Sequence, residues 1–328
     1  MRQGRPQAVT RVVLVVGASS GIGRATAIRL ARRRDHLVLV ARAPRPLADA
    51  AAECVLAGAA SVATHPVDVL DLAGLQEVVA ATHATTGSID AVVHSASVVA
   101  YGRFDQVPAA IWDRVLETNV LGAANVARAV LPDMRERNAG AIVLLGSVIG
   151  EIAVTGMSAY TVSKWALRSL GRCLQLDNRD RPGVRVCVVS LGSVDTPIYQ
   201  QAANYLGHAG RPPPPVYSAE HVATRVVEVL DRPRKRVNIG AANPLMRLGF
   251  ALTPGLFDVL VGPLFRAVAT ARRPMPTGDG NVLSPLPQAE AVGGGHGLGV
   301  RVVLTDLVAR TLDKVRRRSR RGGRARGS

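Results

Sequence analysis

The chain has 328 residues but only three cysteines, Cys54, Cys173 and Cys187. Their number is odd and their spacing is not that of metal ligands, so we expect reduced thiols in a reducing, cytoplasmic compartment. Clusters of His, Cys and acidic residues with metal-binding spacing are also missing, which predicts that no metal is bound. The first seven residues lack the apolar core of a secretory signal, so none is expected.

Acidic residues are missing from the C-terminal end, although the whole chain carries a net charge of +17. The last fifteen residues contain Lys314, Arg316, Arg317, Arg318, Arg320, Arg321, Arg324 and Arg326, and no acid. Apolar residues at helical spacing from Val300 to Val315 predict a basic amphipathic helix. It could dock on an anionic membrane or a partner, or stay disordered. No aromatic residues are interleaved for base stacking, which argues against a dedicated nucleic-acid module.

A glycine-rich turn follows the first apolar segment. Arg11–Val16 is short and β-branched, as in a buried strand, and runs into Gly17-Ala18-Ser19-Ser20-Gly21-Ile22-Gly23. Helical sequence follows. This order suits a dinucleotide, because glycines allow close backbone approach and the helix N-terminus attracts the pyrophosphate. The alternative is a glycine-rich βα turn without a ligand.

Tyr160 and Lys164 form a second motif. They lie four residues apart, so on a helix they share one face. An unperturbed phenol has a pKa of about 10, and lowering it to about 7 requires about 4 kcal/mol, which a neighbouring ammonium and a cationic nicotinamide would supply. Ser147, after the apolar run Ala141–Gly146, could hold a carbonyl oxygen while Tyr160 moves the proton. Alone, such a pair is also common on amphipathic helices.

Segments of strand and helix character alternate through the first 240 residues. Strands are predicted at 11–16, 36–40, 61–67, 89–93, 141–145, 184–189 and 235–239. Helices are predicted at 24–31, 47–56, 72–85, 109–135, 160–178 and 219–230. This alternation predicts an α/β fold, a Rossmann-like doubly wound parallel sheet of about seven strands with helices on both faces. Ligands should bind beyond the carboxyl ends of the strands, where Gly17, Ser147 and Gly192 fall.

With both motifs present, residues 9–240 resemble the short-chain dehydrogenase/reductase family of the compact single-domain type. The resemblance implies a catalytic tetrad of Asn119, Ser147, Tyr160 and Lys164, with Asn119 supporting a proton-relay water. It also implies adenine contacts at Asp68 and Val69, a nicotinamide contact at Thr196, and a homo-oligomer. The sequence departs from the family pattern at Val16, at residues 94–97 and at Leu191, but the four catalytic positions are intact.

The second predicted strand ends without an acidic residue. An NAD-preferring site would place Asp or Glu there to bind the ribose 2′-OH, whereas Arg42 suits a 2′-phosphate. We therefore predict NADP(H); the alternative is that Arg42 and Arg24 are solvated surface charges. The predicted cofactor contacts are Gly17, Ser19, Ser20, Gly21, Ile22, Gly23, Arg42, Asp68, Val69, Tyr160, Lys164 and Thr196.

These features predict an NADP(H)-dependent oxidoreductase that interconverts a secondary alcohol and a ketone or aldehyde on a lipophilic small molecule, with Tyr160 as general acid and base. The different-class alternative is a dinucleotide-sensing or membrane-tethered binding protein that works through its basic tail. Cofactor oxidation against a panel of lipophilic carbonyl compounds would separate the two.

The predicted organisation has four parts: a catalytic domain at 9–243, an apolar helical extension at 244–273, a Pro/Gly-rich flexible linker at 274–299 and the basic tail at 300–328. Arg247, Asp258 and Arg266 interrupt the apolar extension, so it is too broken for a membrane span. It should form two short helices that close over the substrate mouth or pack on a second subunit. The alternative is a peripheral membrane contact that takes up lipophilic substrates.

Overall fold

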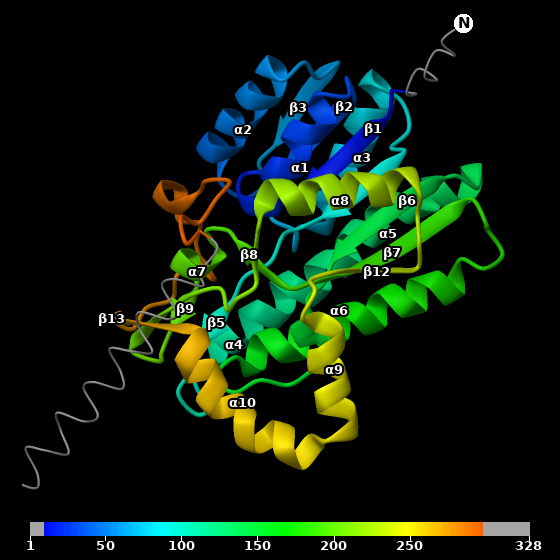
Figure 1. Cartoon of the computed structure of the whole chain (residues 1–328). Coiled ribbons are helices and arrows are strands. Elements are labelled where there is room, and N and C mark those ends of the chain that lie inside the picture. Colours follow the sequence, from blue (N-terminus) through cyan, green and yellow to red (C-terminus); the bar gives the residue numbers. More distant parts are fainter. Residues whose placement is uncertain (1–9, 298–328) are drawn as a thin grey trace, which may run out of the picture.

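The computed structural model describes residues 10–297, and a seven-stranded parallel sheet forms its centre (Figure 1). Across the sheet the order is β12 (Arg236–Ile239), β7 (Val184–Leu191), β6 (Gly140–Leu145), β4 (Ala91–His94), β1 (Val12–Val16), β2 (His36–Val40) and β3 (Ser61–His65). Every neighbouring pair is parallel. The predicted Rossmann-like fold class is therefore confirmed.

Helices cover both faces of this sheet. One face packs against α1 (Gly21–Ala31), α2 (Pro44–Leu56) and α8 (Ala219–Asp231). The other packs against α3 (Leu72–Thr85), α5 (Gly122–Arg137) and α6 (Ser158–Asp177). All five residues of β1 are buried because their side chains alternate between these two cores. Because both faces of β1 are buried, its sequence is a continuous apolar run rather than an alternation of apolar and polar residues.

The chain reverses its winding direction beside β1. Strands β2 and β3 lie on one side of β1, and β4, β6, β7 and β12 lie on the other. At such a switch point the loops after neighbouring strands diverge and leave a crevice at their carboxyl ends. The turn after β1 and the loop after β4 meet there, since the amide of Ser95 donates to the Val16 carbonyl oxygen at 2.9 Å.

The helix predicted over residues 109–135 contains an irregular stretch. It comprises α4 (Ala109–Leu116), a π-helical segment (Glu117–Leu121) and α5. Single π-turns inside helices occur often at functional sites. This one carries Asn119, whose side chain is buried.

Smaller elements surround the crevice and had no signal in the sequence. They are β5 (Ala100–Tyr101), the 3₁₀ turn Val148–Gly150, β8 (Ser193–Asp195), α7 (Ile198–Gln201), β9 (Ala203–Asn204), β10 (His208–Gly210), β11 (Val216–Ser218), β13 (Thr270–Pro274) and the 3₁₀ turn Pro287–Ala289. Most are two or three residues long, and their pairings join distant parts of the chain. Such strands depend on tertiary contacts rather than on local propensity.

The apolar extension forms two helices, α9 (Asn243–Leu252) and α10 (Pro254–Val268), which project from the body as a hairpin (Figure 1). Within residues 10–297 no helix combines the length and apolarity needed to cross a membrane. The predicted basic helix and arginine tail at 300–328 lie outside the described residues.

Candidate active site

The turn between β1 and α1 brings the backbone close to its neighbours at two glycines. Gly17 has φ +83°, and a Cβ added there would lie 2.6 Å from the Ala96 backbone nitrogen. A Cβ added to Gly23 would lie 2.1 Å from the Gly17 carbonyl oxygen. Real Cβ atoms do not approach so closely, so both positions require glycine. The resulting turn presents the N-terminus of α1 to the crevice, which suits a pyrophosphate.

Most of the predicted cofactor residues line one cleft beside this turn. They are Gly17, Ser19, Ser20, Gly21, Ile22, Gly23, Arg42, Val69 and Thr196. The same cleft is also lined by Gln201, Asn281 and Glu290, which were not predicted. The last two come from the Pro/Gly-rich segment, more than 200 residues along the chain from the glycine turn.

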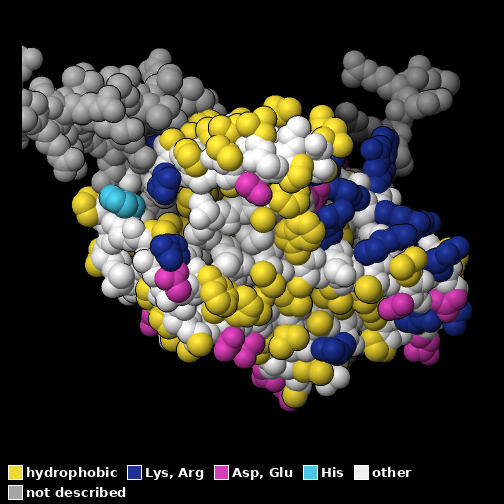
Figure 2. Space-filling view, turned by 90° about the horizontal axis from the view of Figure 1, so that it is seen from below, with side chains coloured by type: hydrophobic (Ala, Val, Ile, Leu, Met, Phe, Trp, Pro, Cys, Tyr) yellow, Lys and Arg dark blue, Asp and Glu magenta, His cyan; other side chains and the backbone are white. Residues whose placement is uncertain are grey.

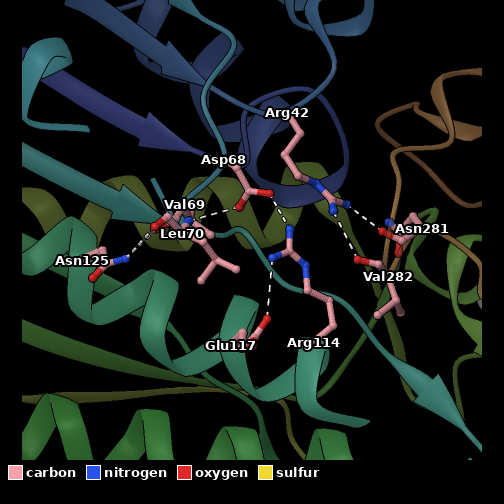
Figure 3. A network of polar contacts seen from close by, with 9 residues as sticks. All are labelled: Arg42, Asp68, Val69, Leu70, Arg114, Glu117, Asn125, Asn281 and Val282. Atoms are coloured by element: carbon pink, nitrogen blue, oxygen red, sulfur yellow. Dashed lines mark hydrogen bonds and ion pairs between the residues drawn. The ribbon is translucent and has the colours of Figure 1, made fainter. Parts of the chain in front are cut away.

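Asp68 lies beside the cleft with its carboxylate already engaged (Figure 3). One oxygen accepts a hydrogen bond from the Leu70 amide at 3.1 Å, and the other forms an ion pair with Arg114 at 2.5 Å. Arg114 also approaches Glu117 at 3.7 Å. The polar network therefore fixes the loop that follows β3 against α4, next to Val69.

Arg42 points toward the C-terminal segment rather than into solvent (Figure 3). Its guanidinium donates to the carbonyl oxygens of Asn281 at 2.6 Å and Val282 at 3.3 Å. Burial lowers the pKa of Arg42 from its ordinary value. Arg24 is 9% exposed and holds Glu53 through two hydrogen bonds of 3.1 and 3.0 Å. Neither arginine is a freely solvated surface charge.

Tyr160 and Lys164 share one face of α6, as predicted, and Ser147 meets them from the end of β6. The Ser147 hydroxyl accepts from the Ile149 amide at 3.2 Å and acts to lower the pKa of the Tyr160 phenol. The Lys164 ammonium lies 5.4 Å from the centre of the Tyr160 ring and donates to the Leu145 carbonyl oxygen at 3.2 Å. Tyr160 packs against an apolar cluster, whereas Ser147 and Lys164 also line a polar cavity.

The side chains of the protein do not by themselves lower the pKa of Tyr160, and the acidification expected beside a cationic nicotinamide stays a prediction. Burial raises the pKa of Tyr160 to about 12, although the Ser147 hydrogen bond acts in the opposite direction. Burial also lowers the pKa of Lys164 to about 8. Both shifts have the same physical cause, because a low-dielectric site disfavours the charged form of each group. The Tyr160 phenol therefore remains protonated at neutral pH.

Asn119 uses its whole amide group to fasten two elements together. Its side-chain oxygen accepts from the Val98 amide at 2.8 Å and from the Ser97 hydroxyl at 3.1 Å. Its amide nitrogen donates to the Val98 carbonyl oxygen and to the Ser163 hydroxyl, both at 2.9 Å. The Ser163 hydroxyl in turn donates to the Tyr160 carbonyl oxygen at 2.8 Å. Asn119 thus connects the loop after β4 to the first turn of α6.

Aromatic and apolar side chains that were not predicted surround Tyr160. They form one cluster of Val99, Tyr101, Ile149, Val154, Met157, Ile198, Tyr199, Ala202, Leu206, Phe265 and Ala269. Burial raises the pKa of Tyr101 and of Tyr199, so their phenols are neutral. Phe265 comes from α10 and lies 6.4 Å from the Tyr101 ring. The apolar hairpin therefore contributes to the wall of the site.

A second cavity, of about 280 Å³, is lined by Lys164 and is strongly basic. It is lined by Gly146, Ser147, Glu151, Lys164, Arg168, Arg172, Gln175, Val188, Ser190, Lys235 and Arg236. Glu151 is paired with Arg236 and, at 3.1 Å, with Arg247 of α9. The cavity therefore adjoins the apolar hairpin.

A doubly wound parallel sheet, a glycine turn at its switch point and a Ser–Tyr–Lys group at the end of β6 and on α6 are the features of a dinucleotide-dependent oxidoreductase. Ser147, Tyr160 and Lys164 do not line the cleft beside the glycine turn. The chain belongs to the short-chain dehydrogenase family, whose model matches residues 11–205. It is accordingly an oxidoreductase that interconverts alcohols and carbonyl compounds by acting on CH–OH groups.

Two relatives and one solved structure cover between 56% and 72% of this chain. The 2-(R)-hydroxypropyl-CoM dehydrogenase of Xanthobacter autotrophicus is 34% identical over 195 residues, which are 58% of this chain and 78% of that protein. The 3-dehydrosphinganine reductase of Danio rerio is 32% identical over 189 residues, 56% of this chain and 57% of that protein. The crystal structure of levodione reductase superposes with a TM-score of 0.63 at 25% identity, covering 72% of this chain and 98% of that one.

The residues at the cleft fit a nicotinamide dinucleotide. Gly17 and Gly23 have no room for a side chain, so a pyrophosphate can approach the backbone closely there. The first residues of α1 line the same cleft, where the helix N-terminus attracts a phosphate. Thr196 lines the same cleft and lies beside the glycine turn, since a Cβ added to Gly21 would be 3.4 Å from the Thr196 Cβ. When bound, this cofactor supplies or accepts the hydride.

Proposed function

We propose that the protein is an NADP(H)-dependent reductase and dehydrogenase of lipophilic secondary alcohols, ketones or aldehydes. The observation that supports it most directly is the Ser147–Tyr160–Lys164 cluster within an apolar and aromatic wall. Tyr160 is the general acid for carbonyl reduction and the general base for alcohol oxidation. A purely dinucleotide-sensing protein would not need this constellation.

Each polar residue has a separate role in the proposed reaction. Ser147 holds the substrate oxygen beside the Tyr160 hydroxyl, because its side chain is near enough to act on the pKa of that phenol. Lys164 places a positive charge near the phenol and favours the phenolate that forms when the proton leaves. Asn119 is a positioning residue, since all four hydrogen bonds of its amide hold the loop after β4 and Ser163.

The apolar wall supports a lipophilic substrate. Around Tyr160 the side chains are aliphatic or aromatic, and the two other phenols there are neutral. Burying one aliphatic side-chain equivalent of substrate is worth about 1.5–3 kcal/mol. A panel of ketones and aldehydes of increasing chain length, followed by NADPH absorbance, should therefore show kcat/KM rising with length. The proposal fails if no carbonyl compound is turned over.

The preference for NADP(H) is tested at Arg42. Arg42→Asp should lower kcat/KM with NADPH by about 10- to 150-fold, because a charge-assisted hydrogen bond of about 1.5–3 kcal/mol is replaced by repulsion. The value with NADH should not fall comparably. Arg45→Asp is a matched control, since Arg45 is exposed at the start of α2. Equal losses with both cofactors would refute the preference.

We also propose that the protein is cytoplasmic and that it contacts anionic membranes through the α9–α10 hairpin. The hairpin exposes Leu245, Leu248, Leu252, Leu256, Val259, Leu260 and Leu264. Figure 2 looks onto this face, where hydrophobic side chains gather and lysines and arginines lie to one side. The basic cavity that adjoins α9 supplies Arg168, Arg172, Lys235 and Arg236. An apolar surface beside cations fits acidic phospholipids.

Leu256→Glu should weaken binding to vesicles of mixed phosphatidylcholine and phosphatidylglycerol at least tenfold in a sedimentation assay. The reason is that a charged group replaces a leucine that would enter the acyl boundary. Leu56→Glu is the control, because Leu56 is more exposed, at 87% against 59%, but lies on α2. Equal binding by both variants would contradict the proposal, as would a dimer that Leu256→Glu dissociates.

A further inference from the structure

Residues 279–297, called here the cleft segment, lie along the dinucleotide cleft. Val282 is fully buried among residues of α4 and the loop after β4. Gln201 accepts from the Asn281 amide at 2.7 Å and donates to the Ala289 carbonyl oxygen at 3.2 Å. The amides of His296 and Gly297 donate to Asp195. The segment predicted as a flexible linker is thus attached to the body at its beginning, middle and end.

The cleft segment uses donors that a dinucleotide phosphate also needs. The Gly21 amide, at the positive N-terminus of α1, donates to the Ala291 carbonyl oxygen at 2.7 Å. The Arg42 guanidinium donates to the Asn281 carbonyl oxygen at 2.6 Å. Helix N-termini and arginines are the usual partners of phosphates. A phosphate and the cleft segment cannot both hold these N–H groups.

Glu290 brings a carboxylate into the same place. Glu290 lines the cleft together with Ser19 and Arg42. Burial raises the pKa of its carboxyl, and the positive charges of Arg42 and Arg24 act in the opposite direction. Its Oε2 atom is buried and has no hydrogen-bond partner within the described part of the chain. One oxygen of the Glu290 carboxylate therefore has no hydrogen-bond donor among the described residues. Ser19 and Arg42 are among the predicted cofactor contacts, and Arg42 is the one chosen for the 2′-phosphate.

The remaining space is small for a dinucleotide. The cleft between the cleft segment and the glycine turn has a volume of about 150 Å³. Sites for drug-sized ligands usually have about 300–1,000 Å³. A doubly charged phosphate with three acceptor oxygens would satisfy more donors than the Glu290 carboxylate does.

We propose that the cleft segment is an internal competitor of NADP(H), in which Glu290 occupies the place of the adenosine 2′-phosphate and must be displaced when the cofactor binds. The inference rests on the proposed cofactor site but not on turnover. It makes Glu290 a determinant of cofactor affinity. The 2′-phosphate gains the partners that Glu290 releases, whereas a cofactor without this phosphate gains none of them.

Hydrogen–deuterium exchange of the full-length protein tests the displacement. The probes are NADP⁺ and the fragments 2′,5′-ADP and 5′-AMP, which contain no nicotinamide. With NADP⁺ or 2′,5′-ADP, amide exchange in peptides covering 279–297 should increase, and 5′-AMP should have a smaller effect. Unchanged or slower exchange there would overturn the proposal, because the cleft segment would then stay in place or close over the ligand.

The carboxylate is tested by titration calorimetry. Glu290→Gln should lower the Kd of 2′,5′-ADP about five- to tenfold and change the Kd of 5′-AMP much less. Glu136→Gln, an exposed residue of α5, is the control and should change neither. The proposal is wrong if Glu290→Gln leaves the Kd of 2′,5′-ADP unchanged, or if it weakens 5′-AMP, which would make Glu290 a ribose ligand. Absence of turnover with normal fragment binding would refute only the proposed function.

Discussion

Tyr160→Phe is expected to lower kcat for carbonyl reduction by about a hundredfold to ten-thousandfold, the usual contribution of a general acid. The change removes one hydroxyl and keeps the ring that packs in the apolar wall. The fold and the dinucleotide Kd should therefore stay near those of the parent. Steady-state kinetics and calorimetry on the same preparation measure both quantities.

Tyr199→Phe provides the matched control for this experiment. Tyr199 belongs to the same apolar cluster, and its phenol is likewise neutral because burial raises its pKa. We expect less than a tenfold change in kcat, since no interaction with Ser147 or Lys164 is lost. If the two substitutions had equal effects, Tyr160 would be one of several packing residues rather than the acid.

The high pKa of Tyr160 also predicts different pH profiles for the two directions. Reduction needs the protonated phenol, which is present across the neutral range because the pKa is raised to about 12. Oxidation needs the phenolate, so its rate should rise with pH over the range in which the protein stays folded. A pH profile of oxidation that is flat from neutral to alkaline pH would contradict the assignment of Tyr160 as base.

The sheet and the catalytic cluster could be predicted because their signals are local. The strand His36–Val40 and the helix Leu72–Thr85 have their predicted bounds, since β-branched runs and helical periodicity operate over a few residues. The spacing of four residues between Tyr160 and Lys164 was enough to predict that they share one face of a helix. Their pKa values were not predictable, because burial by Tyr101, Tyr199 and α10 depends on residues as far along the chain as Phe265.

Amino-acid composition predicted a flexible linker at residues 274–299, whereas the cleft segment within this range is attached to the body of the protein. Pro and Gly residues predict a flexible linker, but Val282 finds a buried site beside Ile111 and Val115. Its other contacts use backbone carbonyl oxygens, which every residue has and which leave no pattern in the sequence. The sequence therefore indicated that Arg42 could bind a phosphate, but not that its guanidinium donates to the carbonyl oxygens of Asn281 and Val282.

Lys164→Met is expected to lower kcat at least a hundredfold, because it removes the charge beside Tyr160 while keeping a side chain of similar length. The substitution should also change how stability depends on pH. Lys164 is 3% exposed, and burial lowers its pKa from 10.5 to about 8. Between these two values the unfolded chain binds a proton that the folded protein does not.

The sign of this linkage is positive: the contribution of Lys164 to the free energy of unfolding increases as pH rises from about 8 to about 10.5. The parent should therefore gain up to about 3 kcal/mol relative to Lys164→Met across this window. Urea denaturation of both proteins at pH 7.5 and at pH 10 measures the difference, and titrations common to both cancel. A difference that stays constant would mean that the Lys164 ammonium is well solvated. The electrostatic role assigned to Lys164 beside the phenol would then be too weak to matter.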